Sequence, residues 1–246
     1  MQSEDLMKYT FESRVRFSEV DDRGYLSLPS LINYLMDCAT FHGEAVGVGL
    51  DWIAEHKMTW VLASFRMKIL RYPKFNTKIR VTTWATAFRG FLGYRDFLVE
   101  TADGELLASG KSDWVYMDMI HNQPLNVKEQ AEAYGIEPDL ALPETFGRRK
   151  IRVKDDGEQQ EPFIVHESNL DTNGHVNSGQ YILLAQNYLP RSFAPQAVRA
   201  EYRKQAYLGE TITPVVHQLE DGCVVELRNV DGEPYFIGAF TREDNE

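Results

Sequence analysis

The sequence contains few cysteines, no long apolar run and no apolar leader. Cys38 and Cys223 are its two cysteines among 246 residues, so a framework of several disulfides is excluded and a reducing cytoplasm is the expected location. No stretch of about eighteen apolar residues occurs, so we expect no membrane span. The first ten residues, MQSEDLMKYT, lack the basic and apolar regions of a signal peptide, so none is expected.

Several motifs of large enzyme classes are also missing. The sequence has no Gly-x-Ser-x-Gly elbow, which argues against a serine hydrolase, and no phosphate loop or dinucleotide fingerprint. His42, Glu44 and His56 do not have the spacing of metal ligands. We therefore expect neither a metal nor a cofactor.

The charge balance is strongly acidic, with a formal net charge of −11. Such a balance argues against nucleic acid as a partner, although a local basic patch can still bind an acidic molecule. The densest basic cluster comprises Arg148, Arg149, Lys150, Arg152 and Lys154. It is either a solvated linker or a docking site for an acidic partner.

The most informative segment is Asp171-Thr172-Asn173-Gly174-His175-Val176-Asn177-Ser178-Gly179-Gln180. It places a carboxylate, an amide and an imidazole at every second position, so an extended backbone directs all three to one side. A helix-like run follows, and Ser178 is expected to be its N-cap. Because a helix start offers free N–H groups, this arrangement suits the attack of water on an acyl group.

A second copy of this pattern occurs earlier in the chain. The run from Asp21 to Leu26 stands 150 positions before the run from Asp171 to Val176, and an amphipathic segment follows each. The first helical face comprises Leu28, Leu31, Ile32, Leu35 and Ala39, with Pro29 in its first turn; the second comprises Tyr181, Ile182, Ala185, Tyr188 and Leu189, and Pro190 ends it.

Strand-like segments follow each predicted helix. They cover residues 59–70, 77–88, 91–101 and 106–118 in the first half, and 197–206, 211–219, 224–230 and 234–241 in the second. Asp103-Gly104 and Asp231-Gly232 are typical of hairpin turns. The predicted fold class is therefore α+β, with a long helix wrapped by an antiparallel sheet in each half.

With these motifs in their observed order, the chain resembles the acyl-acyl-carrier-protein thioesterase family, whose members have two tandem hotdog domains. The matching pieces are Arg71-Tyr72-Pro73, Val81-Thr82-Thr83-Trp84, Arg95-Asp96-Phe97-Leu98-Val99, Trp114-Val115-Tyr116-Met117, Asp171-x-Asn173-x-His175-Val176-Asn177 with Tyr181-Ile182, and Glu201-Tyr202-Arg203-Lys204. The resemblance covers nearly the whole chain. It implies an N-terminal hotdog domain over residues 1–135 that shapes the acyl pocket, a linker over 136–158, and a catalytic hotdog domain over 159–246.

The resemblance also implies roles for individual residues. Asp171 is the expected general base or nucleophile, with turn capping as the alternative. Asn173 is expected to hold water or the thioester carbonyl, and His175 to act as oxyanion donor or base. Gln205 stands where many family members carry an acid, often followed by a cysteine, so it cannot be a base but can position water.

The predicted substrate contacts are less specific. Backbone N–H groups at Asn177, Ser178 and Gly179 are expected to be oxyanion donors. The acyl pocket is expected to involve Leu31, Leu35, Phe65, Met67 and Trp84, for which ordinary core packing is the alternative. The first repeat has Arg23 and Tyr25 in place of the amide and imidazole, so it is expected to do no chemistry.

The expected function is hydrolysis of fatty acyl thioesters on acyl carrier protein. An acyl-CoA thioesterase of the same fold and a non-catalytic acyl-binding module are the alternatives, and Gln205 favours the last of these. Two fused halves can form a monomer, and a homodimer is equally compatible with the sequence.

Overall fold

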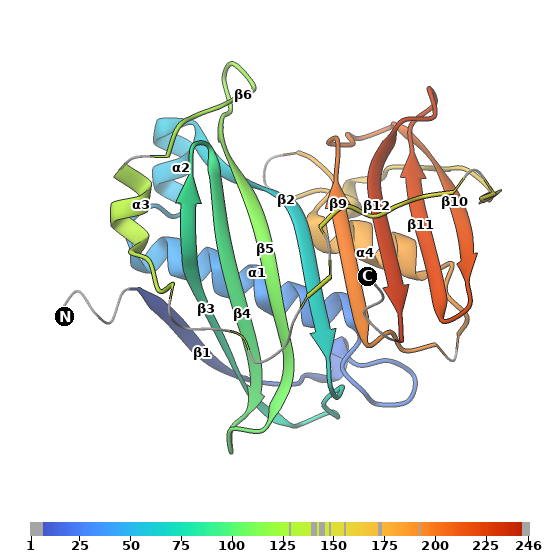
Figure 1. The fold of residues 1–246 in the computed structure, drawn as a ribbon, viewed down its shortest axis with the longest axis horizontal. Helices are drawn as coiled ribbons and strands as arrows, with labels where there is room; N and C mark the ends of the chain where they lie inside the picture. The colour runs from blue at the N-terminus through green and yellow to red at the C-terminus, as the bar shows by residue number, and fades with distance from the viewer. Residues whose placement is uncertain are drawn as a thin grey trace. The chain divides into compact units, whose positions relative to one another are not determined.

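The computed structural model describes residues 7–127, 129–138, 142, 146–147, 149–154, 156–171, 174–191 and 193–242, with residues 129–131 by their backbone alone (Figure 1). The chain divides into two compact units. The first comprises Met1–Ala63 and Leu70–Thr145, and the second Ser64–Ile69 and Phe146–Glu246. The division of the sequence into domains of 1–135 and 159–246 stays a prediction.

The first unit contains three helices and an antiparallel sheet. Its helices are α1 (Leu28–Ala45), α2 (Leu50–His56) and α3 (Glu129–Tyr134). Its strands are β1 (Lys8–Arg14), the first half of β2 (Met58–Ile69), β3 (Lys78–Arg89), β4 (Leu92–Thr101), β5 (Leu106–Asp118) and the short β6 (Gln123–Pro124). The strand order is β1-β3-β4-β5, and α1 lies against β1 and β3. Four strands predicted from residues 59–118 are thereby confirmed, with ends that differ by one residue or none.

Helix α1 forms where the sequence predicts it. The Ser27 hydroxyl accepts the Ser30 N–H at 3.4 Å, and Pro29 stands in the first turn, where its missing N–H removes no helical bond. Leu31, Leu35 and Cys38 recur at helical spacing and are each no more than 1% exposed. Helix α1 thus buries one continuous apolar face against the sheet.

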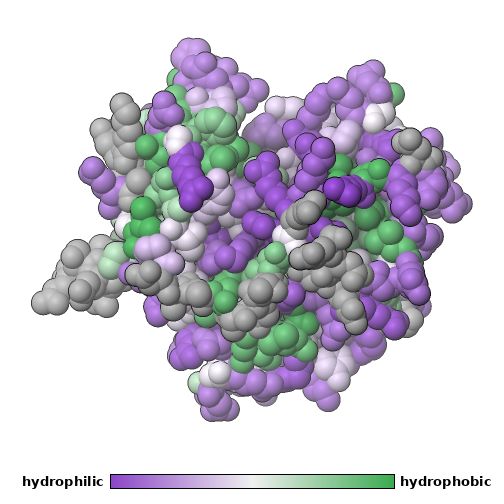
Figure 2. Space-filling view, in the orientation of Figure 1, coloured by the Kyte–Doolittle hydropathy of each residue, from purple (hydrophilic) through white to green (hydrophobic). Residues whose placement is uncertain are grey.

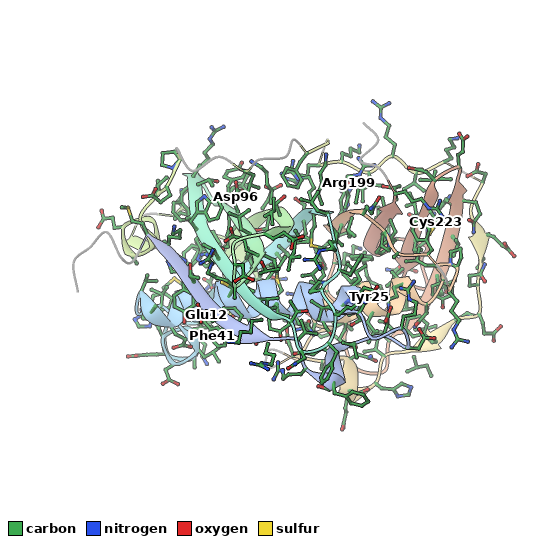
Figure 3. All side chains as sticks on the ribbon, turned by 90° about the horizontal axis from the view of Figure 1, so that it is seen from below. Glu12, Tyr25, Phe41, Asp96, Arg199 and Cys223 are labelled. Atoms are coloured by element: carbon green, nitrogen blue, oxygen red, sulfur yellow. The ribbon has the colours of Figure 1, made fainter. Side chains whose placement is uncertain are left out.

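The two faces of this sheet are distinguished by the strand alternation. Arg95 on β4 donates from Nη1 to His42 Nδ1 at 2.9 Å and to Thr83 Oγ1 at 3.1 Å, so these two strand residues face α1. Trp84 is the next residue on β3 and pairs with Asp96, so both point to the opposite face. Figure 3 shows Asp96 on the side of the sheet away from α1.

The second unit repeats this arrangement with a shorter helix. Its sheet contains the second half of β2, β7 (Glu158–Gln159), β8 (Phe163–Ile164), β9 (Ala197–Tyr202), β10 (Thr211–Leu219), β11 (Gly222–Arg228) and β12 (Pro234–Thr241). The order is β2-β9-β12-β11-β10-β7, with β8 also paired to β10, and α4 (Ser178–Gln186) lies against β11 and β12. A helix on an antiparallel sheet in each unit confirms the predicted α+β class.

Several predicted boundaries in this unit are wrong. Strand β11 covers Gly222–Arg228 rather than 224–230, because Gly222 and Cys223 already pair with Leu219 and Gln218 across the hairpin. Strand β9 ends at Tyr202 rather than at 206, because Arg203 and Lys204 both donate their N–H groups to the Tyr235 carbonyl and the chain leaves the ladder. Helix α4 ends at Gln186, before Pro190, and the residues after it form turns. The N-cap of α4 is Asn177, whose Oδ1 accepts the Gly179 N–H at 2.8 Å, so the prediction of Ser178 as the cap is also wrong.

A segment that we call the strap, residues 149–154 and 156–159, crosses the sheet of the second unit (yellow in Figure 1). Ile151, which is 3% exposed, packs on Val224, Ile237 and Ala239, with Val153 beside it. The Ile151 N–H donates to the Glu201 carboxylate, and Glu158–Gln159 pairs with β10 as β7. The strap therefore covers the face of the sheet that carries Val224, Ile237 and Ala239.

The surface of the face in Figure 2 is mainly hydrophilic, with smaller apolar areas between the polar residues. Among the described residues, no helix is both long enough and apolar enough to span a bilayer. Cys38 and Cys223 are both buried and carry free thiols.

Candidate active site

The site is built on a tight turn at residues 171–176, just before α4. The Asp171 N–H donates to the His175 carbonyl at 2.8 Å, and the Gly174 N–H donates to the Asp171 carbonyl at 3.1 Å. Gly174 has a φ of 77°, a conformation that favours glycine. Asn173, the predicted amide of the site, lies outside the described residues, as does Thr172.

The Asp171 carboxylate takes part in this turn. Its Oδ1 accepts the His175 N–H at 3.4 Å. Asp21 does the same in the first repeat, where its Oδ1 accepts the Tyr25 N–H at 3.0 Å and the Arg23 N–H at 2.9 Å. The turn-capping role of Asp171 is therefore observed. Its role as base or nucleophile stays a prediction.

The two repeats match beyond the turn itself. Isolated bridges join Val20 to Leu26 and Leu170 to Val176, and further bridges join Tyr25 to Lys74 and His175 to Tyr207. The Leu26 N–H donates to the Pro73 carbonyl, and the Val176 N–H donates to the Ala206 carbonyl. Pro73 and Ala206 thus correspond, so Tyr72 occupies the place of Gln205 and Lys74 the place of Tyr207. The internal repeat predicted from the sequence is confirmed by these contacts.

His175 and Gln205 meet at Tyr207. The His175 and Tyr207 rings lie 5.0 Å apart between centroids at an interplanar angle of 78°, an edge-to-face contact. The Tyr207 hydroxyl donates to Gln205 Oε1 at 3.4 Å. The structure therefore brings together two of the predicted catalytic residues around a third residue that the sequence interpretation missed. The signal that was available is the period of two along an extended chain, which puts residues 205 and 207 on one side.

A buried tyrosine fixes the loop that carries Gln205. The Tyr181 hydroxyl accepts the Ala206 N–H at 2.9 Å and donates to the Lys204 carbonyl at 3.5 Å. Burial raises the pKa of Tyr181 well above its usual value, so the hydroxyl stays neutral and keeps both roles. Ala206 is fully buried in this contact, which leaves Gln205 and Tyr207 on the opposite side.

The start of α4 supplies fewer free donors than the sequence predicts. The Asn177 N–H donates to the Asn169 carbonyl at 2.9 Å, and the Gly179 N–H is used by the Asn177 side chain. Both groups are therefore already hydrogen-bonded within the protein, and their role as oxyanion donors stays a prediction. Within the part of the chain that the structure describes, the Ser178 N–H has no recorded acceptor. Among the described residues, the Ser178 N–H is the predicted oxyanion donor that can bind substrate without breaking another hydrogen bond.

The five residues predicted for the acyl pocket belong to three elements, α1, β3 and β2. Leu31 and Leu35 lie on the buried face of α1, whereas Trp84 points to the other face of the sheet. Phe65 and Met67 belong to the second unit, where they pair with Ala200 and Val198. All five are no more than 1% exposed. Their burial fits ordinary core packing, and their contact with an acyl chain stays a prediction.

The described residues contain no cluster of three or more His, Cys, Asp or Glu side chains that fits a metal ion. What the site offers is a carboxylate, an imidazole, an amide and the N–H groups at the start of a helix. This set suits proton transfer and the stabilisation of an oxyanion on a carbonyl substrate.

Comparison with protein-family models gives two matches that together span most of the chain. Residues 6–134 match the acyl-ACP thioesterase N-terminal domain. Residues 153–236 match the acyl-ACP thioesterase C-terminal domain.

Individual relatives are more distant. The chain is 25% identical over 231 residues to oleoyl-acyl carrier protein thioesterase 1 of Arabidopsis thaliana, an alignment that covers 85% of this chain and 64% of the relative. It is 26% identical over 220 residues to the palmitoyl-acyl carrier protein thioesterase of Gossypium hirsutum, covering 82% of this chain and 53% of the relative. The chain thus spans about half to two-thirds of the length of these two curated relatives.

Solved structures show the same fold. An acyl-ACP thioesterase from Bacteroides thetaiotaomicron superposes with a TM-score of 0.84 at 23% identity, covering 98% of this chain and 99% of the other. The 12:0-ACP thioesterase from Umbellularia californica gives 0.82 at 18% identity, covering 96% of both chains. On the strength of the two family-model matches, supported by this fold, the chain belongs to the acyl-ACP thioesterase family.

Proposed function

We propose that this protein hydrolyses the thioester of fatty acyl-ACP and releases a free fatty acid. The observation that carries the proposal is the grouping of Asp171, His175 and Gln205 at the turn before α4, in a chain whose two halves both match the family. These groups match the chemical needs of thioester hydrolysis.

In the proposed reaction, water attacks the thioester carbonyl carbon. Asp171 or His175 takes the proton as the new C–O bond forms, and the carbonyl oxygen becomes an oxyanion. The Ser178 N–H and the Gln205 amide are the proposed donors to that oxyanion. The C–S bond then breaks, and the departing thiolate takes up a proton. The alternative role of Asp171, direct attack on the carbonyl, remains within the proposal.

The first repeat has the same turn without these groups. The Arg23 guanidinium binds Asp21 there, with its Nη2 2.8 Å from Asp21 Oδ2. Lys74 places its Nζ 5.4 Å from the centre of the Tyr25 ring. Neither an amide nor an imidazole stands beside the carboxylate, so we assign the chemistry to the second repeat alone.

A product-release assay tests the proposal. Purified protein is supplied with acyl-ACP and acyl-CoA of matched chain length, over a series of chain lengths, and free fatty acid is quantified. We expect release from acyl-ACP with a kcat/KM above that for acyl-CoA. A higher kcat/KM for acyl-CoA would favour the acyl-CoA thioesterase instead, and the series also gives the preferred chain length.

Gln205 favours a second candidate, a non-catalytic acyl-binding module. An amide cannot take a proton from water, and the family resemblance implies an acid at this place. The same assay separates the candidates. Acyl-ACP that binds tightly and stays intact for hours would support the binding module and contradict the enzyme.

We further propose that the strap is the docking site for the acidic carrier protein. Ile151 is buried, whereas Lys150, Arg152 and Lys154 are exposed. This period of two directs three basic side chains away from the sheet as one stripe. Arg148, also in the predicted basic cluster, lies outside the described residues. The sequence offers a second basic patch, Arg66, Lys68 and Arg71, which is weaker because Arg71 Nη2 lies 2.6 Å from Glu105 Oε2.

Charge reversal tests this docking site. We expect the triple variant Lys150→Glu, Arg152→Glu and Lys154→Glu to raise KM for acyl-ACP about tenfold at low salt and to leave acyl-CoA kinetics unchanged. The matched control reverses Lys8, Lys78 and Arg89, three exposed cations of the first unit. If both triple variants raise KM equally, net charge rather than the strap accounts for the effect.

We also propose a cytoplasmic location and leave monomer and homodimer as the two candidate assemblies. The two buried free thiols support a reducing compartment. Cell fractionation tests the first proposal, and light scattering of the purified protein distinguishes the assemblies.

A further inference from the structure

We propose that Tyr207 is a positioning residue of the active site: its hydroxyl holds the Gln205 amide as a hydrogen-bond donor, and its ring holds the His175 imidazole. The inference rests on the proposed thioester hydrolysis and names a residue that the sequence interpretation did not assign. It is carried by the contacts of Tyr207 with both side chains.

The backbone of Tyr207 is fixed on several sides. It pairs with His175 through an isolated bridge. The Tyr207 N–H donates to Glu210 Oε2 at 2.9 Å, and the Glu210 N–H returns to the Tyr207 carbonyl at 3.2 Å. Glu210 Oε2 also accepts the Tyr235 hydroxyl at 2.9 Å. Tyr207 and Glu210 are joined by two hydrogen bonds, so the backbone of this turn is restrained. The restrained backbone sets the direction in which the Tyr207 side chain points.

The Tyr207 side chain is nevertheless 46% exposed. The backbone of Tyr207 is held in place, whereas its aromatic ring is exposed to solvent. The ring is therefore accessible to a bound molecule. The ring thus stands at the surface of the site rather than in the core, which suits a residue that acts on its neighbours Gln205 and His175.

The hydrogen bond from the Tyr207 hydroxyl determines which part of the Gln205 amide is available to the substrate. Gln205 has one acceptor oxygen and an NH₂ group with two donors. When the Tyr207 hydroxyl occupies Oε1, the NH₂ group is left to face the substrate. Gln205 can then donate from this NH₂ group to the carbonyl oxygen, while Tyr207 uses one of the two lone pairs on Oε1. The contact of 3.4 Å is long for an O–H···O bond, and such contacts shorten when substrate closes a site.

The ring contact acts on His175. An edge-to-face pair restrains the angle between two rings, and the structure shows no hydrogen bond from the Tyr207 hydroxyl to either imidazole nitrogen among the described contacts. The imidazole can therefore still exchange a proton or donate to an oxyanion. The first repeat lacks every part of this arrangement, since Tyr25, Tyr72 and Lys74 occupy the three places.

Two variants separate the two roles. Tyr207→Phe removes the hydroxyl and keeps the ring, and we expect kcat for acyl-ACP to fall about fivefold with KM nearly unchanged, the size of one hydrogen bond. Tyr207→Leu removes both contacts, so we expect it to lower kcat further than Tyr207→Phe does. Tyr25→Phe, at the matching turn of the first repeat, is the control and should keep wild-type kinetics.

A double-mutant cycle shows whether Tyr207 acts through Gln205. In a Gln205→Ala background, we expect Tyr207→Phe to cause no further loss of kcat, because the amide that Tyr207 positions is absent. A fivefold loss that persists in this background would overturn the hydroxyl role. Wild-type kinetics for Tyr207→Phe in the native background would overturn it as well.

An NMR spectrum tests the hydrogen bond between Tyr207 and Gln205 without an activity measurement. The side-chain NH₂ resonances of Gln205, identified by their loss in Gln205→Glu, are followed by ¹⁵N–¹H correlation in wild type and in Tyr207→Phe. We expect them to shift in Tyr207→Phe and to stay in place in Tyr25→Phe. Unshifted resonances would overturn the proposal. If the wild-type protein does not hydrolyse acyl-ACP but the resonances still shift in Tyr207→Phe, the proposed function is overturned and the contact between Tyr207 and Gln205 is supported.

Discussion

Asp21 and Asp171 accept N–H groups in the same way in two turns that have the same form. The pKa of Asp21 reflects the contacts in its own turn. Burial alone would raise that pKa, but N–H groups of Tyr25 and Arg23 and the Arg23 guanidinium bring it below the usual value. An asparagine side chain also accepts N–H groups, so it can keep the turn while removing the charge.

This equivalence gives a controlled test of Asp171. We expect Asp171→Asn to keep the turn, through its amide oxygen, and to lower kcat on the order of 10²–10⁴-fold because the proton acceptor is lost. Asp21→Asn makes the same change in the first repeat and should keep wild-type turnover. Circular dichroism verifies that both variants fold. Equal turnover in the two variants would end the assignment of Asp171 to catalysis.

The two cysteines give a second prediction at this scale. Burial raises the pKa of Cys38 to about 12 and that of Cys223 to about 11, from the ordinary value of 9.0. The neutral thiol is therefore favoured in the folded protein. Its contribution to stability is complete below pH 9 and is lost as the pH rises through the folded pKa values.

Two measurements follow from these raised pKa values. We expect a thiol reagent at pH 8 to label both cysteines far more slowly in the native protein than in urea. Cys38→Ala and Cys223→Ala should each keep near-wild-type turnover, since a buried neutral thiol is a poor nucleophile. Rapid native labelling together with loss of activity would indicate a reactive cysteine instead.

The placement of site residues was predictable where a motif stood at fixed spacing. Asp171 and His175 lie in the predicted turn, and Gln205 reaches the same place. Tyr207 was missed because its contacts with His175 join segments that are distant in the sequence. The spacing of residues 205 and 207 shows only that these two side chains share one side of the chain. The cap at Asn177 rather than Ser178 is a difference of one residue that local propensity does not resolve, since both side chains cap well.

At the scale of elements, both turns depend on a glycine with a positive φ. Gly24 has a φ of 80° and Gly174 one of 77°, and in neither case would an added Cβ meet an atom within 4 Å. A substitution there therefore meets backbone strain alone and no steric clash.

We expect Gly24→Ala and Gly174→Ala each to lower the free energy of unfolding by about 1 kcal/mol. Urea denaturation measures that change. Turnover should fall only in Gly174→Ala, because a relaxed turn there displaces His175. Loss of turnover in both variants, or in neither, would contradict the assignment of the site to the second repeat.

The strands were largely predictable because alternation and hairpin turns agree in these segments. The end of β9 was not, since residues 203–206 look strand-like. Arg203 and Lys204 instead donate their N–H groups to the Tyr235 carbonyl, and the Ala206 N–H donates to the Tyr181 hydroxyl. The sequence also did not distinguish Trp84 from Leu31 and Leu35 when all three were predicted for the acyl pocket. All three are apolar and buried, and only the pairing register shows that Trp84 points away from α1.

At the scale of the whole molecule, the segment expected to be a linker has a structural role in the second unit. Ile151 fills a place on the sheet against Val224, Ile237 and Ala239. The sequence did not reveal this packing, because two apolar residues among basic ones resemble a solvated connection. Family resemblance predicted the two-part architecture well, since it depends on the order of motifs along the entire chain.

The strap therefore contributes to stability. We expect Ile151→Ala to lower the free energy of unfolding by about 2–4 kcal/mol, from lost burial and the cavity that remains. Ile164→Ala removes the same atoms from a side chain that is 52% exposed and should cost much less. Urea denaturation of both variants makes the comparison. Equal losses would show that the strap does not pack on the sheet in solution.

The most direct test of the central claim is a single-turnover reaction of the protein with stoichiometric acyl-ACP in ¹⁸O-labelled water, analysed by mass spectrometry. We predict free fatty acid that carries one labelled oxygen from wild type, and intact acyl-ACP from Asp171→Asn. Intact acyl-ACP from folded wild-type protein would contradict the claim that this site cleaves thioesters.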